Sequence, residues 1–134
     1  ATAGAALLGA PLVHDFAAVS LSAARTPGET IARRLLLAAE GDFVLCLYNP
    51  ASKKRPDTLR QAAELLLRRR APDTPCGLAR RIGREGEESW LCTLGELGEQ
   101  PADMFTTVFV GNSQTQVVNG RLVTPRGYEG KGTL

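Results

Sequence analysis

The chain has 134 residues with a hydrophobic fraction of 43%, which suits one globular domain with a substantial core. With 16 basic and 14 acidic residues the net charge is +2, so the overall charge gives no reason to expect nucleic acid or an anionic membrane as a partner. The sequence contains neither an apolar run long enough for a membrane-spanning helix nor the pattern of a signal peptide, so we expect no membrane partner.

The cysteines argue against a disulfide framework and against a zinc site. Cys46, Cys76 and Cys92 are odd in number and far apart, and the chain has a single histidine. Both kinds of site need paired spacings that are missing here. We therefore predict buried free thiols in a reducing cytoplasm, and no metal site.

The first 41 residues predict a helix end, a strand and a second helix. Residues 1–9 are rich in alanine and resemble the tail of a helix already under way, so we expect the chain to be part of a longer protein. Residues 14–22 form a short apolar segment suited to a buried strand. The TPGE sequence at 26–29 predicts a helix start, with its threonine as the cap and its proline in the first helical position, and Gly41 ends that helix.

Residues 42–49 are continuously apolar, a pattern typical of a central strand covered on both faces. The next helix is predicted to open at Pro56 and to end in an arginine triplet, 68–70. Because cations complement a helix C-terminus, the helix dipole alone explains that triplet and no ligand is needed. The buried stripe of this helix is predicted to be Leu59, Ala62, Ala63 and Leu66.

The second half of the chain is mostly β-like. The expected elements are strands at 76–82 and 89–94 around a polar turn, a short helix with a loop at 94–103, a strand at 106–111, and a hairpin at 116–124 around Asn119-Gly120. This order predicts an α/β fold: a mixed sheet with helices on both faces, parallel where helices cross over and antiparallel near the C-terminus.

Polar residues follow three of the predicted strands, at Tyr48-Asn49-Pro50, Arg81-Ile82-Gly83 and Gly111-Asn112-Ser113. In open α/β sheets ligands bind beyond the carboxyl ends of the strands, and asparagine amides there can both donate and accept hydrogen bonds. Each stretch alone is typical of a turn. Together they leave a ligand-binding edge and ordinary turns as open alternatives.

No catalytic constellation is evident. His14 and Asp15 are adjacent on a predicted strand and would point to opposite faces, while Ser20 and Ser22 have no identifiable base. Neither a dinucleotide-binding nor a phosphate-loop motif is present. We therefore assign no catalytic residue.

Three cations, Lys53, Lys54 and Arg55, directly precede the helix start at Pro56. Positive charge is unfavourable at a helix N-terminus, which suggests an offset such as an anionic ligand. From the sequence alone, a flexible solvated loop is the preferred interpretation.

Several stretches, taken together, resemble a known family. They are LLGAPLVHDFAAVSLS, TPGETIARRLLLAAEGDFVLCLYNPASKKR, DTPCGLARRIGREGEE, TTVFVGNSQT and GRLVTPRGYEG. In order and spacing they are similar to the C-terminal half of the precorrin-3B C17-methyltransferases, which belong to the tetrapyrrole (corrin-pathway) methylases. The resemblance covers nearly the whole chain.

The resemblance implies that residues 1–134 are the C-terminal domain of a two-domain, dimeric enzyme whose N-terminal domain is absent from this chain. It implies transfer of a methyl group from S-adenosylmethionine to C17 of precorrin-3B, with ring contraction, in cobalamin biosynthesis. A non-catalytic α/β binding or dimerisation domain, or a different corrin-ring methyltransferase, remains an alternative.

The resemblance also implies positions for the cofactor and the substrate. The positions matching the family's adenosine pocket are Tyr48, Asn49, Arg81, Ile82, Gly83, Thr106, Thr107 and Val108. Arg81 and Ile82 replace an Asn-Ala pair usual in the family, so contacts there are expected from the backbone. Lys53, Lys54 and Arg55 would attract the carboxylates of the macrocycle.

Overall fold

The computed structural model describes residues 2–12, 15–24 and 26–125. Along the chain the elements are α1 (Thr2–Leu8), β1 (Gly9–Ala10), β2 (Phe16–Ser20), α2 (Gly28–Glu40), β3 (Val44–Tyr48), α3 (Thr58–Leu66), β4 (Pro75–Arg80), β5 (Glu88–Thr93), α4 (Leu94–Leu97), β6 (Thr106–Val110), β7 (Gln116–Val118) and β8 (Arg121–Val123).

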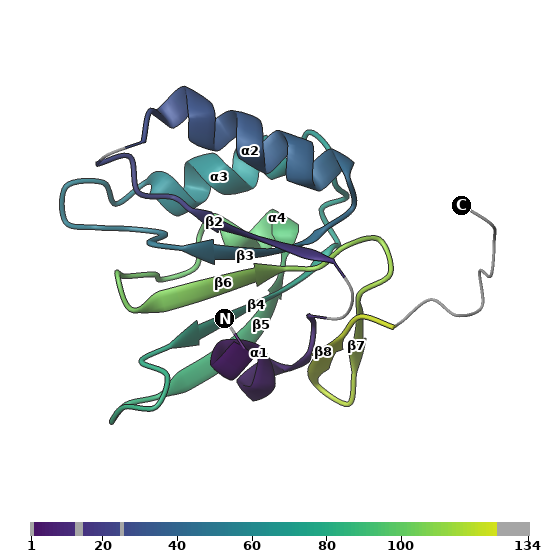
Figure 1. The fold of residues 1–134 in the computed structure, drawn as a ribbon. Helices are drawn as coiled ribbons and strands as arrows, with labels where there is room; N and C mark the ends of the chain where they lie inside the picture. The colour runs from purple at the N-terminus through teal and green to yellow at the C-terminus, as the bar shows by residue number, and fades with distance from the viewer. Residues whose placement is uncertain (1, 13–14, 25, 126–134) are drawn as a thin grey trace.

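The main sheet has five strands in the order β2-β3-β6-β4-β5 (Figure 1). Strands β2 and β3 are parallel, whereas β6 runs antiparallel to both of its neighbours, β3 and β4, and β5 runs antiparallel to β4. Strands β2, β3 and β4 therefore point in one direction, and β5 and β6 point in the other. The predicted mixed sheet is confirmed, but an antiparallel strand lies in its interior.

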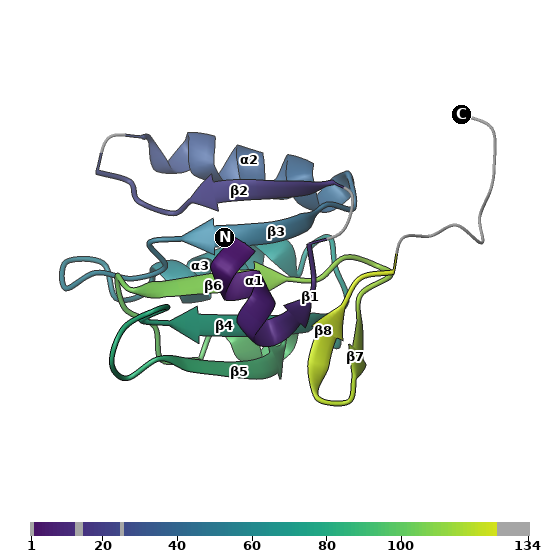
Figure 2. The ribbon, with the colours of Figure 1, turned by 60° about the horizontal axis from the view of Figure 1, so that its bottom comes forward.

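Helices cover both faces of this sheet, as predicted. Helices α2, α3 and α4 lie on one face, and α1 lies on the other beside a small sheet of order β1-β8-β7 (Figures 1 and 2). Side chains along β3 alternate between the two faces: Leu45 and Leu47 join the core under α2–α4, while Cys46 and Tyr48 join the cluster under α1. The apolar run at 42–49 is thus covered on both sides, as its pattern predicted.

Both long helices begin later than predicted. Helix α2 starts at Gly28 with Pro27 as its N-cap, and the Pro27 carbonyl accepts hydrogen bonds from the N–H groups of Thr30 and Ile31. The prediction of a threonine side-chain cap is wrong, because the helix starts one residue further on and no side chain caps it. Helix α3 starts at Thr58, after a turn that contains Pro56, and its buried stripe is the predicted one.

The predicted hairpin is confirmed. Asn119 and Gly120 have φ values of 51° and 73°, the two positive values that a tight two-residue turn between β7 and β8 needs. Strand β8 also pairs in parallel with β1, which places Gly9 opposite Leu122. No side chain would fit at Gly9, because an added Cβ would lie 2.5 Å from the Leu122 carbonyl oxygen.

Among the residues that the structure describes, no helix is both long and apolar enough to cross a membrane.

Candidate functional site

The sheet topology brings three of the predicted site segments to one edge. Because β6 is antiparallel to β3 and β4, its amino end lies beside their carboxyl ends, and Arg80 pairs with Thr106 while Leu47 pairs with Val108. The segments 48–49, 81–83 and 106–108 therefore meet at the edge where β2, β3 and β4 end (Figure 2). We call this the carboxyl edge.

Asn49 is the best-oriented polar side chain at the carboxyl edge. Its Nδ2 donates a 3.1 Å hydrogen bond to Oγ of Ser20, the last residue of the neighbouring strand β2. Its backbone has a φ of 54°, and Arg81 at the end of β4 has the same value. Non-glycine residues in this left-handed region cost some free energy, so the surrounding structure holds both strand ends in a defined backbone conformation.

The side chain of Arg81 is exposed, whereas that of Ile82 packs inside the protein. A Cβ added at Gly86 would lie 3.2 Å from Nη1 of Arg81, so this guanidinium lies over the turn between β4 and β5. Ile82 packs in the cluster under α1, where its Cδ1 lies 2.9 Å from a Cβ added at Gly4.

The backbone N–H and C=O groups of Ile82 are free to bind a ligand. Its N–H and C=O make no hydrogen bond with the other described residues, whereas the Gly83 N–H donates to Glu87 at 3.0 Å. A ligand at this strand end would therefore meet backbone groups of Ile82 rather than side chains.

Tyr48 and Thr107 are half-buried at the carboxyl edge on the α1 side of the sheet. Burial, followed by the neighbouring Cys46 thiol, raises the pKa of Tyr48 to about 12. The phenol is thus neutral at physiological pH and able to donate a hydrogen bond. The side chains of Thr106 and Val108 are buried, so these residues shape the strand and do not offer side chains to a ligand.

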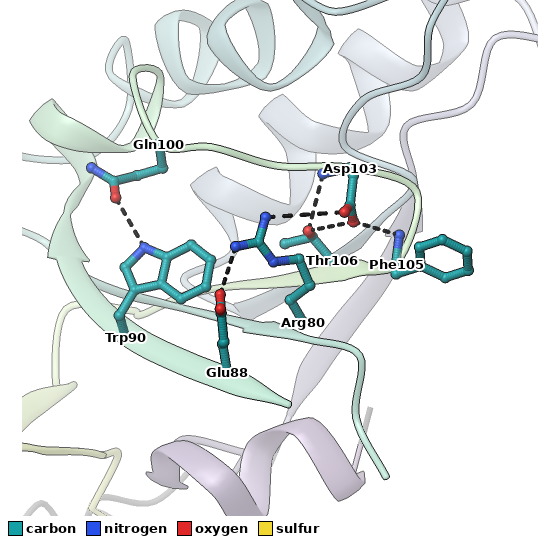
Figure 3. Close-up of polar contacts among 7 residues, drawn as sticks. All are labelled: Arg80, Glu88, Trp90, Gln100, Asp103, Phe105 and Thr106. Atoms are coloured by element: carbon teal, nitrogen blue, oxygen red, sulfur yellow. Dashed lines mark hydrogen bonds and ion pairs between the residues drawn. The ribbon is translucent and has the colours of Figure 1, made fainter. Parts of the chain in front are cut away.

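A hydrogen-bonded turn leads into β6 (Figure 3). The Asp103 carboxylate accepts hydrogen bonds from the Phe105 N–H at 2.8 Å and from the Thr106 hydroxyl at 3.1 Å. The Asp103 N–H in turn donates to Thr106 Oγ1 at 3.0 Å. These bonds fix the backbone of residues 103–106.

Arg80 supports this turn from the sheet side. Its guanidinium donates to Glu88 at 2.6 Å, lies 4.0 Å from the Asp103 carboxylate, and stacks 5.3 Å from the centre of the Trp90 ring (Figure 3). Trp90 in turn donates from Nε1 to Gln100 at 2.9 Å. The start of β6 is therefore held from β4, β5 and the preceding loop.

The basic loop at 51–56 and the turn at 102–105 enclose a groove of about 670 Å³. The residues lining it are Ala51, Ser52, Lys53, Lys54, Pro56, Ala102, Asp103, Met104 and Phe105. A second hollow of about 440 Å³ shares Ala51, Ser52, Lys54 and Met104 with the groove and extends to Asn49. Of these two spaces, Arg55 lines only the second, and it also lines a hollow between α2 and α3. The groove therefore continues to the carboxyl edge.

The prediction that Gly111-Asn112-Ser113 shares this edge is wrong. These residues follow the antiparallel strand β6 and lie at the opposite end of the sheet. A hollow of about 790 Å³ lies there, and several of its polar groups bond within the protein, although Nε of the lining residue Arg70 is buried without a partner among the described residues. Ser113 donates from its N–H and its hydroxyl to Asp42, and Asn112 Oδ1 accepts from the Gln114 and Thr115 N–H groups, as in an ordinary turn.

Arg70, at the same opposite end, has a role that the helix dipole does not explain. Its guanidinium donates to the carbonyl oxygen of Gly111 at 2.7 Å and to that of Phe43, joining the end of α3 to the end of β6 and the start of β3. The dipole explanation of the arginine triplet is therefore wrong for Arg70, because tertiary hydrogen bonds hold it.

Neither the pairing of Ser20 with Asn49 nor the turn at 103–106 was predicted from the sequence. An aspartate three residues before a threonine at a strand start was the available signal for the turn, since such aspartates bond to the backbone that follows them. His14, considered above for acid–base chemistry, lies outside the described residues.

Comparison with known proteins gives one consistent family. Residues 1–98 match the family model for Tetrapyrrole (Corrin/Porphyrin) Methylases. The chain is 48% identical to a probable cobalt-factor III C(17)-methyltransferase of Salmonella typhimurium and 46% identical to a precorrin-3B C(17)-methyltransferase of Sinorhizobium sp. Each alignment covers 94% of this chain and 52% of the relative, so the chain spans about half the length of these curated relatives.

Solved structures give the same picture. The crystal structure of the methyltransferase CobJ superposes with a TM-score of 0.87 at 38% identity, over 92% of this chain and 52% of that one. A uroporphyrin-III C-methyl transferase from Thermus thermophilus, complexed with S-adenyl homocysteine, superposes with a TM-score of 0.60 at 22% identity, over 82% of this chain and 48% of that one. The second likeness is one of fold.

Proposed function

This chain belongs to the tetrapyrrole methylase family, and we propose that it is the C-terminal domain of an S-adenosylmethionine-dependent methyltransferase acting at C17 of precorrin-3B or cobalt-factor III. The observation that carries the proposal is 48% identity to a probable C(17)-methyltransferase across 94% of the chain. Such a reaction belongs to cobalamin biosynthesis, with the tetrapyrrole as the small-molecule substrate.

The carboxyl edge fits one side of an S-adenosylmethionine site. The Asn49 amide, oriented by Ser20, keeps its Oδ1 for a donor of the ligand, and the Ile82 backbone offers one donor and one acceptor. The neutral phenol of Tyr48 and the half-buried Thr107 flank these groups. The backbone at this edge is shaped by the remaining predicted residues, Arg81, Gly83, Thr106 and Val108. When bound, the cofactor supplies an electrophilic methyl group on its sulfonium.

The task of this chain's residues is binding and orientation. Methyl transfer needs the methyl group and the accepting carbon in line, and fixing that geometry supplies a large part of such catalysis. Hydrogen bonds from Asn49 and Ile82 would fix the adenosine end, while Lys53, Lys54 and Arg55 would attract the carboxylates of the substrate. No residue of this chain is assigned as a general base.

We further propose that this domain works together with an N-terminal domain that closes the other side of the site, and that the enzyme is a cytoplasmic homodimer. The coverage of only 52% of the curated relatives supports a partner domain. The free thiols of Cys46, Cys76 and Cys92 support a reducing compartment.

The test is calorimetric titration of S-adenosylhomocysteine into the full-length protein and into this chain alone, followed by an assay of methyl transfer to precorrin-3B with the position of the new methyl group determined by NMR. We expect binding and C17 methylation by the full-length protein and weaker binding by the chain alone. A full-length protein that binds no S-adenosylhomocysteine, or that methylates another carbon, would overturn the proposal.

A further inference from the structure

We propose that Cys76 and Cys92 form a reversible redox pair, in which hydrogen peroxide oxidises the Cys92 thiol and the buried Cys76 thiol then closes a disulfide between β4 and β5. We call these two residues the thiol pair. It lies at the amino end of β4, away from the carboxyl edge, so the inference goes beyond the proposed function and does not depend on it.

The sheet places the two cysteines directly opposite each other. Strands β4 and β5 are antiparallel neighbours at one side of the main sheet, and Cys76 of β4 pairs with Cys92 of β5 (Figure 2). Both side chains lie on the face covered by α2–α4, where Cys76 belongs to the core and Cys92 packs against it. Side chains of directly opposite residues contact each other on one face of a sheet, so the two thiols are neighbours.

The pairing also sets the distance between the two backbones. The Leu94 N–H donates to the Thr74 carbonyl oxygen at 2.8 Å, so these two residues form a hydrogen-bonded pair. Because such pairs recur at every second residue of an antiparallel ladder, Cys76 and Cys92 form one as well. The Cα atoms of a hydrogen-bonded pair lie about 5.5 Å apart, within the range of about 4.4–6.8 Å that a disulfide spans. A disulfide can therefore form in the existing register.

The same geometry makes this disulfide easy to reduce. The Cβ atoms of a hydrogen-bonded pair lie at the long end of about 4.5–5.5 Å, whereas a disulfide prefers about 3.8 Å. Closing the bond therefore draws the two strands together and strains the link. Strained disulfides have higher reduction potentials and are the labile ones, so cellular thiols such as glutathione would reduce it.

The two thiols differ in exposure and in acidity. Cys92 is half-buried, whereas Cys76 is fully buried and its Sγ lies 3.6 Å from the Thr74 carbonyl oxygen. The neighbouring Cys76 thiol lowers the pKa of Cys92. The Cys92 thiol, followed by burial, raises the pKa of Cys76. Because peroxide reacts with the accessible thiolate, Cys92 is oxidised first and Cys76 acts as the resolving thiol.

The oxidation proceeds in two balanced steps. In the first, the Cys92 thiolate attacks one oxygen of hydrogen peroxide, the O–O bond breaks, and the sulfur becomes a sulfenic acid while hydroxide leaves and takes up the proton that the thiol released. In the second, the Cys76 sulfur attacks the sulfenic sulfur, the S–S bond forms, the S–O bond breaks, and water leaves with the Cys76 proton. Overall the two thiols lose two electrons and two protons, and one peroxide becomes two waters. Two glutathione thiols reverse the oxidation and become glutathione disulfide.

The thiol pair would keep Cys92 repairable. A sulfenic acid that meets no second thiol is oxidised further to sulfinic and sulfonic acids, which are irreversible for most proteins. Cys76, directly opposite, converts the sulfenic acid to a disulfide instead. Cys46 lies on the other face of the sheet, where its strand neighbours are Ala18 and Phe109, so it serves as the control thiol.

The test treats the full-length protein with a small excess of hydrogen peroxide, blocks the remaining thiols with iodoacetamide, and identifies tryptic peptides by mass spectrometry without reduction. Trypsin releases Cys76 in the peptide 71–80 and Cys92 in the peptide 85–121, so the disulfide joins these two peptides. The variants are Cys92→Ser and Cys76→Ser, with Cys46→Ala as the matched control. Cys76→Ala replaces Cys76→Ser if the buried hydroxyl prevents folding.

We expect the linked peptides in wild type and in Cys46→Ala, their loss after glutathione is added, and no link in either variant of the thiol pair. In Cys76→Ser, dimedone should trap a sulfenic acid at Cys92, and further peroxide should produce about tenfold more Cys92 sulfinic acid than in wild type. In Cys92→Ser, the buried Cys76 should stay reduced.

A folded wild type that gives no linked peptides, with Cys92 either reduced or present as a sulfinic acid, would overturn the inference, and this result needs no variant. A link that glutathione does not reverse would show a structural disulfide and would also overturn it. Equal oxidation of Cys76 in Cys92→Ser and of Cys92 in Cys76→Ser would overturn the order of the two steps. None of these readouts uses methyl transfer, so a failure of the proposed function would leave them unchanged.

Discussion

The side-chain amide of Asn49 donates a 3.1 Å hydrogen bond to the hydroxyl of Ser20, joining the ends of two parallel strands at the proposed cofactor edge. Asn49 adopts a φ of 54°, which glycine accepts at no steric cost. Asn49→Gly therefore removes the amide without straining the backbone. We expect it to weaken S-adenosylhomocysteine binding to the full-length protein by about tenfold, as for one lost hydrogen bond, and to change the unfolding free energy by less than about 1 kcal/mol.

The matched control for this variant is Asn119→Gly. Asn119 also has a positive φ, 51°, but lies in the β7–β8 turn away from the carboxyl edge. Calorimetric titration of both variants separates the two effects. Equal affinity in Asn49→Gly and wild type would remove Asn49 from the binding site.

Arg70→Met should destabilise the domain much more than Arg68→Met. Arg70 is half-buried and its guanidinium donates hydrogen bonds to the carbonyl groups of Gly111 and Phe43. The substitution would leave both carbonyl groups without this charged donor. Arg68, by contrast, is exposed. Hydrogen bonds to charged groups contribute about 1.5–3 kcal/mol, so we expect a loss of about 2–4 kcal/mol for Arg70→Met and under about 0.5 kcal/mol for Arg68→Met. Urea unfolding measures both, and equal values would show that Arg70 is not a tertiary anchor.

Local patterns predicted the elements of this fold well. The buried stripe of α3 follows helical spacing, and the Asn119-Gly120 turn follows from the need for two positive φ values. The uninterrupted apolar run at 42–49 predicted a strand covered on both faces, which β3 is. These features depend on residues close to one another in the chain.

The position of β6 could not be predicted in the same way. Nothing local distinguishes a strand that pairs antiparallel between β3 and β4 from one at the edge of the sheet, because the pairing joins residues far apart in sequence. This one relationship decided which polar strand ends share an edge. It placed Thr106 and Thr107 beside Asn49, and moved Asn112 to the opposite end.

The direction in which a side chain points could not be predicted from the sequence either. The sequence does not tell whether a basic residue after a helix faces solvent or turns inward, as Arg70 does onto the carbonyls of Gly111 and Phe43. Nor does it tell that Met104 and Phe105 stay exposed beside an apolar strand, which follows from the Asp103 turn that holds them outward. The family resemblance supplied positions at the site, and the structure shows which atoms at those positions are accessible.

Gly77→Ala should destabilise the domain because α1 and β8 pack directly on this glycine. An added Cβ would lie 2.8 Å from Cδ1 of Leu8 and 2.9 Å from Cδ1 of Leu122, both buried. Overpacking of this kind costs about 1–3 kcal/mol. The control is Gly28→Ala at the start of α2, where nothing lies within 4 Å of the added Cβ, and thermal unfolding of that variant should show no loss. A Gly77→Ala protein as stable as wild type would mean that α1 shifts without cost.

Tyr48 gives the fold a dependence on alkaline pH whose sign is fixed by the direction of its pKa shift. Burial, followed by the neighbouring Cys46 thiol, raises the pKa of Tyr48 from 10.0 to about 12, so folding favours the neutral phenol. This contribution to stability is fully present below the unfolded value of 10.0 and is lost as the pH rises through about 12. Difference titration of tyrosinate absorbance between wild type and Tyr48→Phe should therefore give a midpoint near 12, and the wild type should lose unfolding free energy between these values relative to the variant. A difference midpoint near 10.0 would show instead that the phenol is solvated and does not pack under α1.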